Sequence, residues 1–147
     1  MSKLASLTLT MSANLPSFNF AISRLMDDGW SINATEKIVF LVDEIDGYDW
    51  RSTTDAVSTV MTNLEEHFKN GHRVGLTLVW RDAPETSVDF IVKLNAEVQF
   101  ILGGEYKQIN NNSHFADISW YVTHLAHPLE DDSVQFRTES LLWTEDT

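Results

Sequence analysis

Three β-strand patterns follow one another between residues 73 and 102, separated only by short connections. RVGLTLVWR (73–81) places apolar residues at every second position, which is the period of a strand with one buried face. A turn at residues 82–85 leads to SVDFIVKL (87–94), and two further residues lead to EVQFIL (97–102). Connections this short join neighbouring antiparallel strands, so the sequence predicts a three-stranded antiparallel meander.

Three other segments carry apolar residues at the 3.6-residue spacing of an amphipathic helix. The first spans 16–27, with Pro16 in its first turn and Gly29 as the residue that ends it. The second has its apolar stripe over 57–68 and ends at Asn70-Gly71. The third spans 114–126. The expected N-terminal caps are Thr53 or Thr54 for the second helix and Ser113 for the third.

The remaining strand patterns complete an alternation of strands and helices. Residues 4–13 alternate in polarity, KIVFLV (37–42) is a continuous apolar run, and 133–143 is a final strand, while Gly103-Gly104 breaks the strand pattern. The predicted order is therefore β-α-β-α-β-β-β-α-β. We expect one α+β domain over residues 1–147, with a mainly antiparallel sheet and three amphipathic helices.

The charge balance excludes several classes of partner. Aspartate and glutamate number 22 against 10 lysines and arginines, which gives a formal net charge of −12. A nucleic-acid-binding surface is basic, and an anionic membrane would repel this chain, so neither partner is expected. The chain has no cysteine, which excludes disulfides, thiolate zinc sites and cysteine nucleophiles. No apolar run is long enough to span a bilayer, and we expect a cytoplasmic protein.

No pattern of catalytic or metal-binding residues stands out. His124 and His127 are three residues apart but lack the intervening glutamate of the H-E-x-x-H motif. His67 and His72 flank a predicted helix end, where the macrodipole alone accounts for them. The acidic run that starts at Asp43 does not fit an EF-hand loop, because residues 42 and 53 would have to be carboxylates. The sequence also lacks a G-x-S-x-G elbow, a P-loop and a G-x-G-x-x-G motif, so we expect no enzyme activity, no metal and no cofactor.

An acidic segment that contains aromatic residues lies between the first buried strand and the second helix. From Asp43 to Asp55 there are five acids and one base, Arg51. Two interpretations stay open: a solvated loop whose aromatics fold onto the core, or a recognition loop with aromatic anchors and carboxylates for a basic partner. The predicted partner-binding residues are Asp43, Glu44, Asp46, Tyr48, Asp49 and Trp50, with a second cluster at Glu130, Asp131 and Asp132.

Two segments resemble small bacterial immunity proteins of contact-dependent growth inhibition and related polymorphic toxin systems. They are the strand GLTLVWRD (75–82), which follows a helix, and SWY (119–121) on a later helix. The resemblance spans residues 30–143 and rests on core-type residues. It implies a cytoplasmic protein that binds and neutralises the C-terminal domain of one cognate toxin, often a nuclease.

Other functions fit the composition as well. An acidic inhibitor that mimics DNA would need carboxylates spaced along one face, whereas the acids here are clustered. A small hydrolase or ligand-binding α+β domain would show a deep pocket with convergent polar groups. A housekeeping interaction subunit would bind a partner that is not a toxin.

Overall fold

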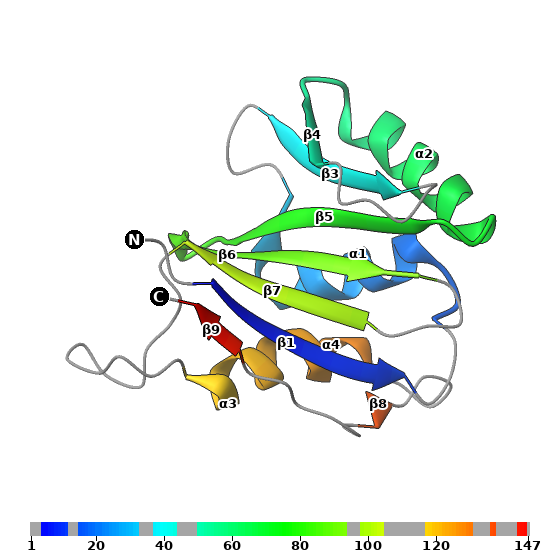
Figure 1. Cartoon of the computed structure of the whole chain (residues 1–147). Helices are drawn as coiled ribbons and strands as arrows, with labels where there is room; N and C mark the ends of the chain where they lie inside the picture. The colour runs from blue at the N-terminus through cyan, green and yellow to red at the C-terminus, as the bar shows by residue number, and fades with distance from the viewer. Residues whose placement is uncertain are drawn as a thin grey trace.

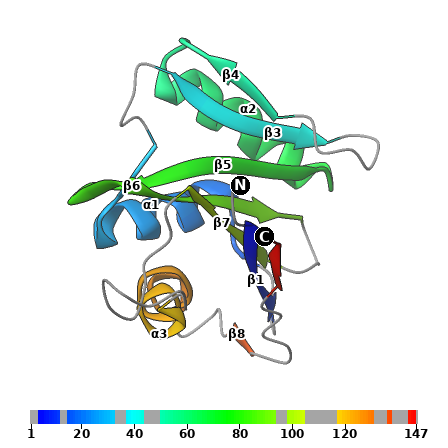
Figure 2. The ribbon, with the colours of Figure 1, turned by 60° about the vertical axis from the view of Figure 1, so that its left-hand side comes forward.

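An antiparallel sheet with helices packed against one face makes up the fold (Figures 1 and 2). The computed structural model describes residues 4–11, 15–32, 37–43, 50–93, 98–104, 117–130, 136–137 and 144–146. The centre of the sheet is the predicted meander of β5 (Arg73–Trp80), β6 (Ala83–Val92) and β7 (Val98–Gly104). Leu76 pairs with Phe90, and Phe90 pairs with Phe100. These three residues therefore lie side by side on the face of the sheet that is turned toward the core.

The other strands extend this meander on both sides. Their order is β4-β3-β5-β6-β7-β1-β8, with β2 also beside β5 and β9 also beside β1. Every pairing is antiparallel, which confirms the α+β class and the mainly antiparallel sheet. The bounds are β1 Leu4–Met11, β2 Trp30–Ser31, β3 Ile38–Asp43, β4 Trp50–Thr53, β8 Phe136–Arg137 and β9 Thr144–Asp146.

The helices lie side by side along one face of the sheet (Figure 2). In this layer α1 (Phe18–Asp28) lies between α2 (Val57–Lys69) and the third helical region. That third region is not one uniform helix. It begins as α3 (Ile118–Tyr121), continues as a π-helical segment over Val122–Ala126, and ends as α4 (His127–Leu129).

The core fills the space between the helix layer and the sheet. Phe18 of α1 stacks on Phe90 of β6 at 5.9 Å between ring centroids and lies 6.3 Å from Phe68 of α2. Phe90 in turn stacks on Phe100 of β7 at 5.3 Å. The predicted apolar stripes of α1 and α2 are buried or half-buried. They are covered because these apolar side chains, which recur at helical spacing, pack against the inward-facing apolar residues of the strands.

The helix ends differ in part from the sequence prediction. Gly29 ends α1 with φ of +135°, and Asn70-Gly71 ends α2, as expected. Pro16 precedes the helix and is not in its first turn, because the cap of α1 is Ser17, whose Oγ accepts a hydrogen bond from the Phe20 amide at 2.9 Å. The cap prediction for α2 is wrong: Ala56 holds that position, and the Thr53 hydroxyl instead accepts from the Asp55 amide. Ser113 lies outside the described residues, and the cap of α3 is instead Asp117, whose carboxylate accepts a hydrogen bond from the Trp120 amide at 3.1 Å.

Three strand predictions also need correction. Residues 50–53, predicted as loop, form β4, because they pair with 38–41 of β3. Gly103 and Gly104 do not break the strand pattern but are the last two residues of β7, where they pair with Ser87 and Thr86 of β6. The turn between β5 and β6 occupies residues 81–82, two residues fewer than expected. Of the predicted strand 133–143, the described part is β8.

Candidate functional site

The predicted acidic recognition segment joins the two outermost strands at one end of the sheet order. β3 ends at Asp43 and β4 begins at Trp50, and the two strands pair with Leu41 opposite Trp50. Asp43 also stands opposite Arg73 in the β3–β5 register, which places the segment at the start of β5. Four of the predicted residues lie outside the described part of the chain: Glu44, Asp46, Tyr48 and Asp49.

Trp50 packs on the face of the sheet opposite the helices and stays partly exposed. An added Cβ on Gly75 would come within 3.2 Å of the Trp50 ring and 2.8 Å of the Phe90 carbonyl oxygen. Glycine at position 75 therefore lets the tryptophan ring lie directly against the strand. Trp50 is half-buried, so one side of the ring packs against the strand and its exposed part is available to a partner. This position suits both interpretations that the sequence left open.

The second acidic cluster does not join the first. Glu130 is exposed at the end of α4, and its backbone carbonyl accepts a hydrogen bond from Arg24 of α1 at 2.9 Å. The Arg24 Nε atom donates to the Pro128 carbonyl at 2.8 Å, so this arginine ties the end of α4 to α1. α4 lies behind β1, whereas β3 and β4 lie at the opposite end of the sheet (Figure 1). Asp131 and Asp132 lie outside the described residues.

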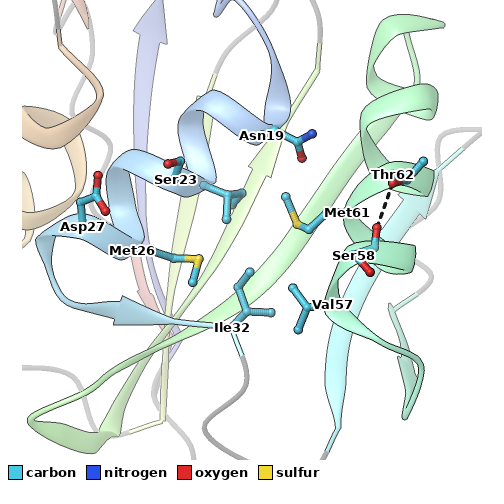
Figure 3. Close-up of a pocket in the computed structure, with 10 residues that line it drawn as sticks. Asn19, Ser23, Met26, Asp27, Ile32, Val57, Ser58, Met61 and Thr62 are labelled. Atoms are coloured by element: carbon cyan, nitrogen blue, oxygen red, sulfur yellow. Dashed lines mark hydrogen bonds between the residues drawn. The ribbon is translucent and has the colours of Figure 1, made fainter.

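A groove of about 460 Å³ runs between α1 and α2, and sequence reasoning did not predict it (Figure 3). Apolar side chains from α1, α2 and the segment after β2 point toward one another across it, and polar side chains surround them. Met26 contributes a side chain that is 39% exposed. The apolar lining is Ile22, Met26, Ile32, Val57 and Met61, and the polar lining is Asn19, Ser23, Asp27, Ser58 and Thr62.

A tryptophan cluster surrounds His124 where α1 ends. The ring centroid of His124 lies 4.7 Å from that of Trp80 and 4.6 Å from that of Trp120. The His124 Nδ1 atom is 2.8 Å from the Asp28 carboxylate. The Trp30 indole donates to the His124 carbonyl at 2.7 Å, inside the π-helical segment where the backbone bonding pattern is changed. His124 therefore connects α1, β2 and the third helical region.

Asp89 of β6 is a half-buried carboxylate on the sheet face opposite the helices. Burial raises the pKa of this carboxyl above its ordinary value of 3.8, although the hydrogen bond from the Thr77 hydroxyl, at 2.7 Å, lowers it. The folded chain therefore holds this proton more tightly than the unfolded chain. The stability that protonated Asp89 provides is complete below pH 3.8 and is lost as the pH rises through the folded-state pKa.

We therefore expect Asp89→Asn to be more stable than the wild type at pH 7. The amide stays neutral, and its oxygen still accepts from Thr77. Urea unfolding at a series of pH values should show the difference closing as the pH falls toward 3, where Asp89 is protonated. A difference that is constant over this whole range would contradict this account.

Comparison of the chain with family models, with curated proteins and with solved structures finds no match. Among the described residues, no helix has both the length and the apolar character needed to cross a membrane.

Proposed function

We propose that this protein binds and neutralises a basic protein domain, a nuclease-type toxin in the cytoplasm, as the immunity proteins it resembles do. The observation that carries the proposal is the excess of 22 acids over 10 bases, with an acidic and aromatic segment placed between the two outermost strands. The contact surface is the segment from Asp43 to Trp50. We name this segment the β3–β4 connection.

The chemistry of the β3–β4 connection suits such a partner. Nuclease domains carry lysine and arginine because these side chains bind the phosphates of nucleic acid. A carboxylate-rich surface accelerates association with such a domain through electrostatic steering, and the rate falls as salt is added. Tyr48 and Trp50 provide large apolar areas of the kind that slow dissociation at interfaces. The exposed part of Trp50, held in place by its packing over Gly75, is such an anchor.

Two charge-reversed variants with the same net charge test this surface. Asp46→Lys/Asp49→Lys alters the β3–β4 connection, and Asp82→Lys/Glu85→Lys alters exposed positions at and just after the β5–β6 turn. Asp43 stands opposite Arg73 and Ala83 opposite Trp80, so the two pairs of positions lie at opposite ends of β5. Calorimetry against the basic domain that this protein captures in a pulldown should show affinity at least about tenfold lower for the first variant only.

The control variant separates a local contact from overall charge. If both variants lose affinity equally, general attraction explains the binding and the assignment of the β3–β4 connection is wrong. If neither variant loses affinity although the wild type binds, the partner contacts another surface. Circular dichroism of both variants should match that of the wild type.

The groove between α1 and α2 supports a second candidate function, the binding of a small amphipathic molecule. Its volume of about 460 Å³ lies within the range of ligand sites, and its lining combines five apolar with five polar residues. Ser58 lies on the α2 side of the groove, so Ser58→Trp should block it (Figure 3). A fluorescent apolar dye is the probe. If the groove is the binding site, dye that binds the wild type should not bind this variant.

A further inference from the structure

The C-terminus of α2 ends in a Schellman motif that holds two histidines in place. The Gly71 amide donates to the Phe68 carbonyl, and the His72 amide donates to the His67 carbonyl, both at 3.0 Å. Gly71 has φ of +84°, the left-handed conformation that this motif requires. The backbone therefore fixes the positions of residues 67 and 72 relative to one another.

The motif brings together two side chains at positions that are often apolar. The residues at these two positions of a Schellman motif frequently make a hydrophobic contact. Here they are His67 and His72, and their Nδ1 atoms lie 2.9 Å apart, with ring centroids separated by 5.1 Å. Both histidines are half-buried, so their imidazoles are held in place but still accessible. Two ring nitrogens that face one another at this distance must share either a proton or a cation.

We propose that His67 and His72 form a site for a divalent transition-metal ion, with copper(II) bound most tightly. Metal–imidazole bonds are about 2.0–2.1 Å long, so two nitrogens on adjacent corners of a square are about 2.9 Å apart. The Nδ1 atoms already have this separation. Copper(II) favours such tetragonal geometry and nitrogen ligands, and it leads the usual order of affinities, ahead of nickel(II) and zinc(II).

The proton and charge balance of the site is simple. Without metal, one imidazole donates its Nδ1 proton to the Nδ1 atom of the other. Metal binding moves that proton through solvent to Nε2 of the same ring, so both rings stay neutral and both Nδ1 lone pairs face the ion. The site lies at the C-terminal end of α2, where the helix dipole favours a cation.

The described part of the chain supplies two ligands to this site. It contains no group of three or more histidine, cysteine, aspartate or glutamate side chains that could hold a metal. Two nitrogen ligands leave the other coordination positions of the ion open to a further ligand.

Titration of the full-length protein with copper(II) chloride, followed by calorimetry and electron paramagnetic resonance, tests the site. The wild type should bind one ion through two equatorial nitrogens at this site. His72→Asn places an amide where Nδ1 was, so it retains a hydrogen-bonding partner for His67 but loses an imidazole. We expect its copper affinity to fall at least tenfold, and the two-nitrogen spectrum to disappear.

Two further variants keep the test decisive. His67→Asn should reproduce the loss, and His127→Gln, which alters an exposed histidine elsewhere, should leave copper binding unchanged. Thermal unfolding without metal shows whether each variant is folded. Copper affinities that are equal in the wild type, His72→Asn and His67→Asn would overturn the proposal, and so would a wild type that binds no copper at tenfold molar excess.

Discussion

Replacing Trp30 by alanine is expected to lower the free energy of unfolding by about 4 kcal/mol, since large-to-small core changes at tryptophan cost about 3–5 kcal/mol. Its side chain is 1% exposed, and its ring packs edge-on against Trp80 at 5.1 Å and Trp120 at 6.0 Å. The substitution also leaves the His124 carbonyl without the indole donor at 2.7 Å. The cavity would open where α1, β2, β5 and the π-helical segment meet.

Urea denaturation followed by far-UV circular dichroism measures this loss. Trp30→Phe is the matched control, because it keeps an aromatic ring but removes the hydrogen bond, and it should lower the free energy of unfolding by about 2 kcal/mol. If Trp30→Ala lowers it by less than about 1 kcal/mol, the tryptophan cluster is not part of the cooperative core.

Replacing Glu65 by alanine is expected to lower the free energy of unfolding by about 3 kcal/mol, which is unusual for a charged residue on a helix. Glu65 belongs to α2 and is 9% exposed, and its carboxylate accepts hydrogen bonds from the first amides of α1. The Phe18 amide donates to it at 3.0 Å and the Asn19 amide at 3.3 Å. Without Glu65, these two amides lose their acceptor, and the positive end of the α1 dipole loses its negative charge.

The adjacent residue offers a matched control for this prediction. Glu66 is exposed on the same helix, so Glu66→Ala should change the free energy of unfolding by no more than about 0.5 kcal/mol. Glu65→Gln keeps one acceptor oxygen without the charge and should cost about 1 kcal/mol. Equal effects of Glu65→Ala and Glu66→Ala in urea denaturation would show that the carboxylate does not couple the two helices.

The parts of the fold that follow from local periodicity could be predicted from the sequence. The strands of the meander turn alternate apolar residues toward the helices, and α1 and α2 each bury one apolar stripe, so both patterns can be recognised without knowing their partners. Gly29 was also recognisable as a helix stop. The structure adds a second reason for this glycine, because an added Cβ would come within 2.7 Å of the Trp80 ring.

The parts that depend on distant contacts could not be predicted. The carboxylate that caps α1 comes from Glu65, 47 residues beyond the Phe18 amide it binds. β4 has no strand period of its own and exists because β3 offers it a free edge. Gly103-Gly104 has the composition of a turn, yet pairing with β6 keeps it extended. The groove and the contact between His67 and His72 likewise require the folded positions of two segments.

The most direct test of the proposed function is growth protection. Bacteria that produce the toxin domain captured by this protein in a pulldown are made to co-produce either this protein or its Asp46→Lys/Asp49→Lys variant. The wild-type protein should restore colony formation, and the variant should do so less well at equal protein levels. Continued killing in the presence of abundant, folded wild-type protein would contradict the proposed function.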